Sequence, residues 1–394
     1  MTALFDGVGL IVTNDPTNSD GDGSALGLIR DAAFVVDGSQ LLWIGRASTA
    51  QPADDHHDLG GRTVIPGFVD SHTHLVFDGD RAAEFSARMA GTPYAAGGIG
   101  VTVRATRQAT DATLRHRVGQ LLAELASSGV TTIEVKSGYG LTIADEQRSL
   151  EIAREFTTEA TFLGAHVVPD EYAGRRDAYV DLVIGDMLAA CAPHAKWIDV
   201  FCDRGAFDVD ESRTILQAGL RAGLLPRLHA HQLQHLGAIQ LGVELGAASV
   251  DHCNHVDDAD LEALASSDTV ATVLPGADFS TRSDYADARR MVDAGVTVAI
   301  ATDCNPGTSY TTSMPLCIAV AVREMGLSVE EALWAATAGG ARALRRADVG
   351  VLRRGLRADF ATIDAPSFVH LAYRPGVCLI NQTWKDGERL APRT

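Results

Sequence analysis

Apolar positions along the 394-residue chain change their spacing at about residue 66. Before that point, short apolar or β-branched runs alternate with turn residues, which is typical of a small all-β region. After it, short apolar runs alternate with longer segments in which apolar residues recur at helical spacing. In 111–128, for example, Leu114, Val118 and Leu121 fall on one stripe. Strands that alternate with helices indicate βα units around a parallel sheet.

Eight runs in the second region have the length and composition of buried strands. They are 67–70, 131–135, 161–164, 197–201, 226–228, 248–250, 270–274 and 296–301. Eight parallel strands with intervening helices are what a (β/α)8 barrel requires. The β character returns at 359–364 and 377–381. We therefore predict an α/β fold, with a TIM barrel at 66–348 and a small β-sandwich domain formed by 1–65 and 349–394.

Two helix starts are also visible. Thr142 precedes Asp145, and Ser328 precedes Glu331, the spacing of a residue that caps a helix and an acidic residue in its first turn.

Composition and charge restrict the class of protein. Hydrophobic residues make up 46% of the chain and charged residues 21%, typical of a globular protein with a large core. No apolar run approaches the roughly 18 residues that cross a bilayer, and the N-terminus lacks a signal-peptide pattern, so we expect a cytoplasmic protein. The net charge of −18 argues against a nucleic acid or an anionic membrane as partner. The six cysteines include no Cys-x-x-Cys pair, which favours reduced thiols.

Polar side chains follow the predicted barrel strands, at the rim where barrel enzymes place their active sites. His72 and His74 are two residues apart, so on a strand both imidazoles would face one metal ion. His229 and His231 have the same spacing, and the residues alone leave open which of them would be a ligand. Further ligand types at the rim are Lys136, His166, Asp203, Asp251, His252, His255, Asp278 and Asp303. We predict a metal site there.

Several strings resemble a known family. The chain contains Pro66-Gly67-Phe68-Val69-Asp70-x-His72-x-His74, then a mid-chain histidine, Asp251-His252 and Thr302-Asp303, and this set resembles the amidohydrolase superfamily. Longer strings resemble its imidazolonepropionase family, namely His74-Leu75-Val76-Phe77-Asp78-Gly79-Asp80-Arg81, Thr102-Val103-Arg104-Ala105-Thr106-Arg107, Glu134-Val135-Lys136-Ser137-Gly138-Tyr139-Gly140-Leu141 and Asp303-Cys304-Asn305-Pro306-Gly307-Thr308. The likeness covers nearly the whole chain. It implies a metal-dependent hydrolase that converts 4-imidazolone-5-propanoate to N-formimidoyl-L-glutamate in histidine degradation.

The resemblance also implies residue roles. One Zn²⁺ or Fe³⁺ ion per chain would be bound by His72, His74, His229 and Asp303. His252 would transfer protons, and Asp303 would share this role by accepting a hydrogen bond from the activated water. Arg81 would bind the propionate of a small anionic substrate. The other positions that match substrate or product contacts are Tyr94, Tyr139, His166, Gln232, Asn305, Gly307 and Thr308. The family also suggests a homodimer.

Three alternatives remain open. Lys136 follows an early strand, where some amidohydrolases carry a carboxylated lysine that bridges two metals. Another cyclic amidohydrolase, or an aminohydrolase acting on a ring such as guanine or cytosine, would have the same barrel. Gln232 stands where a deaminase commonly has a titratable glutamate, which counts against the second of these. A non-catalytic barrel would be expected to lack ligands, and none of the four is missing. The chain also departs from the family at His231, where an aspartate is usual, and in 94–100, which is several residues shorter.

Overall fold

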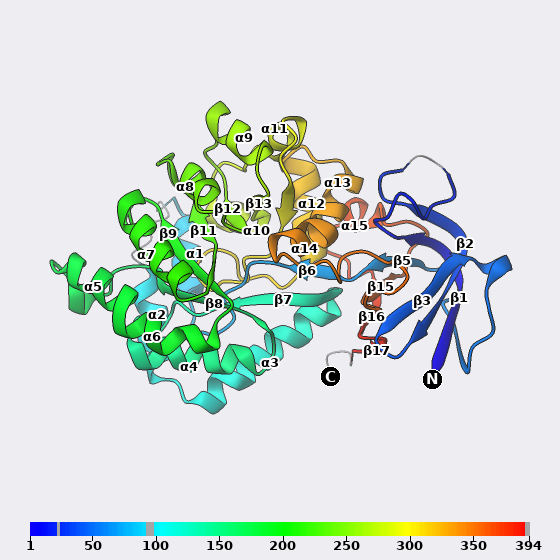
Figure 1. Ribbon diagram of the computed structural model, residues 1–394, viewed down its shortest axis with the longest axis horizontal. Helices are drawn as coiled ribbons and strands as arrows, with labels where there is room; N and C mark the ends of the chain where they lie inside the picture. Colours follow the sequence, from blue (N-terminus) through cyan, green and yellow to red (C-terminus); the bar gives the residue numbers. More distant parts are fainter. Residues whose placement is uncertain (22–23, 92–97, 391–394) are drawn as a thin grey trace. The chain divides into compact units, whose positions relative to one another are not determined.

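The computed structural model describes residues 1–21, 24–91 and 98–390 (Figure 1). Contacts within the chain divide it into two compact units. Unit 1 comprises 1–70, 122–132 and 312–394, and unit 2 comprises 71–121 and 133–311. The domain limits given by the sequence patterns remain a prediction.

The β-rich ends of the chain lie in one sheet of unit 1. Its strand order is β17-β16-β15-β5-β1-β2-β3, and β4 also pairs with β1. Strands β15 and β5 pair in antiparallel register, with Phe360 opposite Pro66, which joins the C-terminal strands to the N-terminal ones. The strands are β1 Thr2–Val12, β2 Leu28–Asp37, β3 Gln40–Arg46, β4 Asp55–Asp58, β5 Thr63–Pro66, β15 Phe360–Ile363, β16 Ile380–Lys385 and β17 Glu388–Arg389.

The second sheet is the predicted barrel, with the order β14-β13-β12-β11-β9-β8-β7-β6 and with β10 paired to β9. An isolated parallel bridge between Thr73 and Cys304 joins the segment after β6 to the segment after β14 and closes the ring. The strands are β6 Phe68–Asp70, β7 Val130–Lys136, β8 Glu159–Ala165, β9 Trp197–Cys202, β10 Leu225–Pro226, β11 Leu228–Ala230, β12 Ser249–His252, β13 Val270–Val273 and β14 Val298–Ile300. Every predicted barrel strand is confirmed, although the run at 226–228 is divided between β10 and β11.

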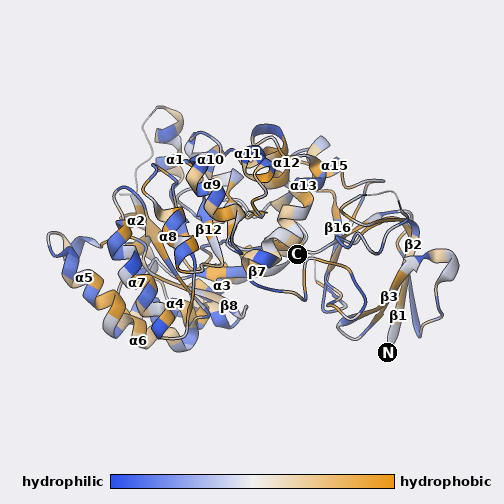
Figure 2. Cartoon of the chain, turned by 45° about the horizontal axis from the view of Figure 1, so that its top comes forward, coloured by the Kyte–Doolittle hydropathy of each residue, from blue (hydrophilic) through white to orange (hydrophobic). Residues whose placement is uncertain are grey.

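Helices separate the barrel strands along the chain. Thr142 and Ser328 accept hydrogen bonds from the backbone at Asp145 and Glu331, which confirms both predicted helix starts. Helices such as α4 and α7 carry hydrophobic and hydrophilic residues side by side (Figure 2), as expected when one face is buried. The helices are α1 Ala82–Met89, α2 Ile99–Gln108, α3 Asp111–Ser127, α4 Ile143–Arg154, α5 Arg176–Leu182, α6 Leu188–Cys191, α7 Val209–Arg221, α8 Ala238–Glu244, α9 Asp258–Ala265, α10 Pro275–Thr281, α11 Ala288–Asp293, α12 Met314–Glu324, α13 Val329–Trp334, α14 Gly340–Ala343 and α15 His370–Tyr373. None of the helices in the described part of the chain has the length and apolar character needed to span a membrane.

Four aromatic side chains organise the core of the unit 1 sheet. Phe5 stacks on Phe34 at 4.8 Å between ring centroids, and Phe360 stacks on Trp384 at 5.6 Å. Phe5 also meets the edges of Phe360 and Trp384 at 5.2 and 4.9 Å. Offset and edge-to-face pairs of this kind add to the stabilisation from burial.

Replacing Phe360 by alanine should lower the free energy of unfolding by about 3–5 kcal/mol, because the fully buried ring leaves a cavity. Urea denaturation followed by circular dichroism measures the change. The control is Leu42→Ala, in which a side chain 44% exposed is shortened and the effect should stay within about 0.5 kcal/mol. Equal unfolding midpoints for the two variants would contradict this account of the core.

Candidate active site

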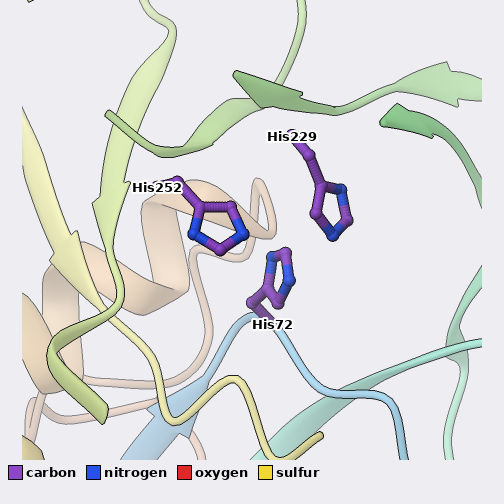
Figure 3. A group of neighbouring side chains, drawn as sticks. All are labelled: His72, His229 and His252. Carbon is purple, nitrogen blue, oxygen red and sulfur yellow. The ribbon is translucent and has the colours of Figure 1, made fainter. Parts of the chain in front are cut away.

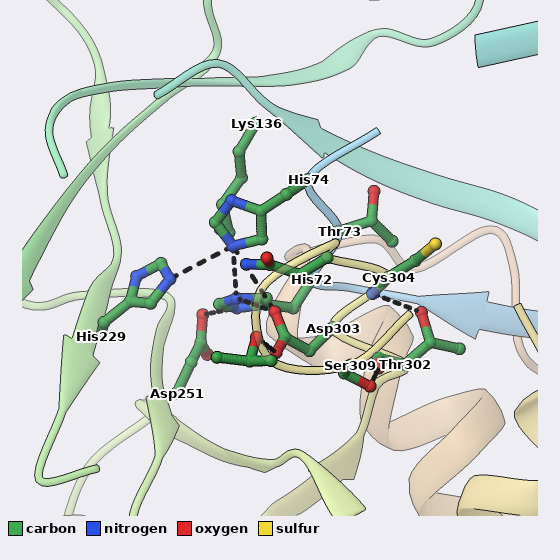
Figure 4. A network of polar contacts seen from close by, with 12 residues as sticks. His72, Thr73, His74, Lys136, His229, Asp251, Thr302, Asp303, Cys304 and Ser309 are labelled. Carbon is green, nitrogen blue, oxygen red and sulfur yellow. Dashed lines mark hydrogen bonds and ion pairs between the residues drawn. The ribbon is translucent and has the colours of Figure 1, made fainter. Parts of the chain in front are cut away.

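Four metal-ligand side chains converge in unit 2 at the C-terminal ends of the barrel strands (Figure 4). His74 Nε2 lies 3.2 Å from His72 Nε2 and 3.4 Å from His229 Nε2. Asp303 Oδ1 lies 3.6 Å from the Nε2 atoms of both His72 and His74. Metal–ligand bonds of about 2.0–2.2 Å place tetrahedral donors about 3.3–3.6 Å apart. The measured separations fit donors to one cation. His72, His74 and Asp303 form one candidate metal group, and His229 adjoins it through His74.

The backbone of the barrel closure sets this geometry. Asp303 donates its backbone N–H to His72 O at 3.1 Å, and His74 donates to Cys304 O at 3.0 Å. Asp303 itself has a positive φ of 49°, a region that aspartate tolerates better than most residues.

Two of the three histidines are oriented by buried carboxylates. His72 Nδ1 lies 2.7 Å from Asp251 Oδ2, and His229 Nδ1 lies 3.0 Å from Asp199 Oδ1. A carboxylate that accepts the Nδ1 proton leaves the Nε2 lone pair available for a metal. Burial, and then the positive charge of Lys136, holds the pKa of His72 well below its usual value, so the ring is neutral and able to ligate.

Each supporting carboxylate is paired with a buried cation. Lys136 Nζ lies 2.8 Å from Asp199 and 2.9 Å from Glu134, and Arg227 Nη2 lies 3.3 Å from Asp251. All five side chains are fully buried. Burial opposes the charged form of Lys136, but Asp199 and Glu134 outweigh it and raise the lysine's pKa. An ammonium between two carboxylates is the opposite of a carboxylated lysine, so this geometry argues against a two-metal centre.

His252 stands beside the donor set. His72, His229 and His252 point toward one another (Figure 3), and their ligand nitrogens lie within 4.8 Å. Burial, followed by the nearby His229, lowers the pKa of His252 to about 3. This side chain is therefore a weaker base in the protein than the unperturbed histidine on which the prediction relied.

His231 is excluded from the donor set by its own hydrogen bonds. Its Nε2 accepts the backbone N–H of Ala238, at the start of α8, at 3.0 Å. A neutral ring that accepts at Nε2 carries its proton on Nδ1, and that atom faces Asp260 Oδ2 at 3.5 Å. His231, His235 and Asp260 lie close enough together to hold an ion, but the protonated Nδ1 makes His231 a donor rather than a ligand. Of the two competing histidines, the structure thus brings His229 to the metal donors.

Two buried arginines lie beside the segment that follows Asp303. Arg81 directs Nε and Nη2 to Glu84 at 2.8 and 2.7 Å, and Arg88 Nη1 lies 3.7 Å from the same carboxylate. Arg88 Nη1 also donates to Gly307 O at 2.7 Å. Both guanidinium groups are buried, with 8% and 5% of the residues exposed. Glu84 thus occupies the edge of the Arg81 guanidinium formed by Nε and Nη2, and Nη1 lies against Gly307.

Several of the remaining predicted contact residues are hydrogen-bonded to one another or to Asp303. Asn305 Oδ1 accepts from Tyr139 OH at 2.7 Å and from the Gly307 N–H at 2.8 Å. Thr308 Oγ1 donates to Asp303 Oδ2 at 2.6 Å, and His166 stacks on His74 at 5.3 Å between ring centroids. Gln232 is buried just after β11. Tyr94 lies outside the described residues.

Some site residues were missed in the sequence. Asp199 lies in Trp197-Ile198-Asp199-Val200-Phe201, and Arg227 lies between Pro226 and Leu228. A charged residue within a short apolar strand is a signal of a buried, paired group. Glu134, to which the sequence patterns assign no role, accepts the N–H of Thr73, which lies between His72 and His74, at 3.1 Å. No comparable signal exists for Arg88, which lies in an ordinary polar helix.

Replacing Asp251 by asparagine should weaken metal binding about ten- to a hundredfold, because His72 loses its carboxylate partner and Arg227 loses its counter-charge. Competition with a chromophoric chelator for Zn²⁺ measures the affinity without any assay of activity. The matched control is Asp268→Asn, at an exposed aspartate. Equal Zn²⁺ affinities in the two variants would refute a supporting role for Asp251.

Comparisons with known proteins agree with this site. The model of the amidohydrolase family matches residues 63–390. Imidazolonepropionase of Mycolicibacterium smegmatis is 62% identical over 98% of this chain and 97% of its own length, and that of Rhodococcus jostii is 60% identical over 98% and 94%. A triazine hydrolase variant matches with a TM-score of 0.79 at 18% identity over 99% of this chain and 94% of its own. Guanine deaminase of C. acetobutylicum matches with a TM-score of 0.71 at 14% identity. The match covers 99% of this chain and 100% of the deaminase chain. These distant structures show the shared fold alone. The chain belongs to the amidohydrolase family and, within it, to the imidazolonepropionases.

Proposed function

We propose that this chain hydrolyses 4-imidazolone-5-propanoate to N-formimidoyl-L-glutamate, with one Zn²⁺ or Fe³⁺ ion held by His72, His74, His229 and Asp303. Water adds to the ring carbonyl carbon, and the bond from that carbon to the ring nitrogen breaks. The carbonyl becomes a carboxylate, and the leaving nitrogen takes up a proton to become part of the formimidoyl group. The relatives of 58–62% identity that carry the name imidazolonepropionase support this reaction.

The observation that carries the proposal is the segment from Asp303 to Thr308. At one end it supplies a carboxylate to the metal donors, and at the other Gly307 O accepts from Arg88, beside Arg81. Both buried arginines contact the Glu84 carboxylate, so two guanidinium groups lie at this end of the segment. A guanidinium binds a carboxylate through paired hydrogen bonds, so the propionate would lie at Arg81 while the ring of the same molecule lies over the donor set.

The side chains then divide the work as follows. When bound, the metal supplies Lewis-acid activation of water at neutral pH. Asp303, whose Oδ2 is held by Thr308, orients the attacking water. His252 lies beside the donor set, and we assign it the transfer of the proton from the attacking water to the leaving nitrogen. Tyr139, Asn305 and the Gly307 backbone orient the substrate ring.

The cysteines support a reducing compartment, and we propose a cytoplasmic enzyme. All six are free thiols, five of them buried.

Purified protein should convert enzymatically generated imidazolonepropionate and contain about one metal ion per chain. Asp303→Ala should lose turnover, because it removes a ligand and the group that orients water. Absorbance of the substrate and metal analysis measure both effects, with Asp268→Asn as the control. A metal-loaded protein that is inert toward this substrate but hydrolyses guanine or a hydantoin would overturn the proposed substrate.

Arg81→Gln should lower kcat/KM about ten- to a hundredfold, chiefly through KM, because a hydrogen bond to a charged group contributes about 1.5–3 kcal/mol. Steady-state kinetics with a metal determination on each preparation provide the measurement. The control is Arg154→Gln, an exposed arginine of α4. A KM equal to that of the control would remove Arg81 from the propionate site.

A further inference from the structure

The loop between β7 and α4 holds two proposed substrate groups at once. Tyr139, within the loop, donates its hydroxyl to Asn305 Oδ1 at 2.7 Å. Gly138 O lies 2.9 Å from His166 Nδ1, which fixes that ring as well. The position of the loop backbone therefore sets the position of both side chains.

A single carboxylate of helix α4 binds the amides of this loop. Glu146 Oε1 accepts from the N–H of Gly140 at 2.8 Å and of Leu141 at 2.7 Å, and Glu146 Oε2 accepts from Gly138 N–H at 3.0 Å. The loop can converge on one carboxylate because Gly138 and Leu141 have positive φ, of 105° and 55°. Successive amides that point inward in this way form a concave anion site.

The loop packs too closely for other residues at two positions. A Cβ on Gly140 would lie 2.6 Å from the backbone at Asp145 and Glu146, and one on Gly138 would lie 2.9 Å from His166 Nδ1. The backbone is thus in direct contact with the start of α4 and with the His166 ring.

Glu146 is fully buried, and its known partners are all donors. Burial raises the pKa of Glu146, while donation from Ser137 and the loop amides opposes the rise. A carboxylate accepts all of these bonds, whereas a protonated acid would direct its own hydrogen at a donor. The group also lies in the first turn of α4, where the helix dipole favours an anion.

A cation of helix α2 binds the same loop from its other side. Arg107 Nε donates to Gly140 O at 2.6 Å, and Arg107 Nη2 lies 2.8 Å from Glu171, which follows His166 in the chain. The Glu146 carboxylate on α4 thus accepts from the N–H groups of the loop, and the Arg107 guanidinium on α2 donates to the Gly140 carbonyl. Within the described residues, the hydrogen-bond and ion-pair partners of Glu146 and Arg107 do not include the proposed metal ligands.

We infer that Glu146 and Arg107 are positioning residues that hold the 138–141 loop so that Tyr139 and His166 meet the substrate. The inference rests on the proposed function in one respect, namely that Tyr139 and His166 contact the substrate. The structural part of it concerns the loop alone.

Glu146→Gln is the most direct test, because it keeps the shape of the side chain but puts an amide donor against loop donors. We expect kcat/KM to fall about ten- to a hundredfold, as for a small misplacement of reacting groups. Metal content should stay at the wild-type level. Glu146→Gln and Tyr139→Phe should be non-additive in a double-mutant cycle, because Glu146 acts in part through the Tyr139 hydroxyl.

The matched control is Glu151→Gln, at an exposed position of the same helix. If Glu146 only stabilises the fold, its effect on kcat/KM will add to that of Tyr139→Phe and metal content will fall with the melting temperature, which would overturn the inference. If Glu146→Gln does not fold, Arg107→Gln takes its place in the double-mutant cycle with Tyr139→Phe. Removal of the Arg107 charge leaves no buried anion without a partner.

A second readout is independent of activity. In protein labelled with 3-fluorotyrosine, the ¹⁹F resonance absent from Tyr139→Phe identifies Tyr139 among the seven tyrosines. We expect Glu146→Gln to shift this resonance and Glu151→Gln to leave it unchanged. An unchanged resonance would overturn the positioning role. Failure of the wild-type protein to hydrolyse imidazolonepropionate, with the resonance shifted, would overturn the proposed function alone.

Discussion

The active site depends on a balance of buried charges beneath the three histidines. Asp251 and Asp199 each bind a histidine on one side and a cation on the other, Arg227 and Lys136 respectively. Without its cation, either carboxylate would be an unpaired anion away from water, which is strongly unfavourable. Without its carboxylate, each histidine would lose the partner that turns Nε2 toward the metal. The interior of this barrel is therefore polar near its rim, where many barrels are filled with branched apolar side chains.

The backbone at the rim is strained where the functional side chains emerge. His252 has a φ of 82° and Cys253 of 55°, while His231 and Asp303 have 59° and 49°. Such conformations cost about 1–3 kcal/mol each and persist only when surrounding contacts enforce them. Here the enforcing contacts include Cys253 N to Ala230 O and Asp303 N to His72 O, both between neighbouring strand ends. The backbone hydrogen bonds between the strand ends thus offset the strain of these conformations and keep the functional side chains in the site.

The sequence predicts the barrel well because buried strands and helices differ in period, and each of the eight apolar runs became a strand. It also brings His72, His74 and Asp303 to one rim, since parallel strands end on the same side. The choice between His229 and His231 depends on which imidazole accepts the Ala238 amide, a tertiary contact that no local pattern encodes. The pairing of Arg81 with Glu84 follows a local i,i+3 spacing, whereas the contact of Arg88 with Gly307 depends on packing between segments far apart in the chain.

The closure of the barrel has a consequence for biosynthesis. Asp303 reaches the histidines only through the backbone bonds that join the segment after β14 to the one after β6. A growing chain exposes His72, His74 and His229 long before the ribosome reaches Asp303. Until then the three imidazoles have no fourth ligand and the strand ends have no ring to hold them, so the complete coordination sphere cannot exist on the nascent chain. The four proposed ligands can therefore come together only late in synthesis, once the barrel has closed.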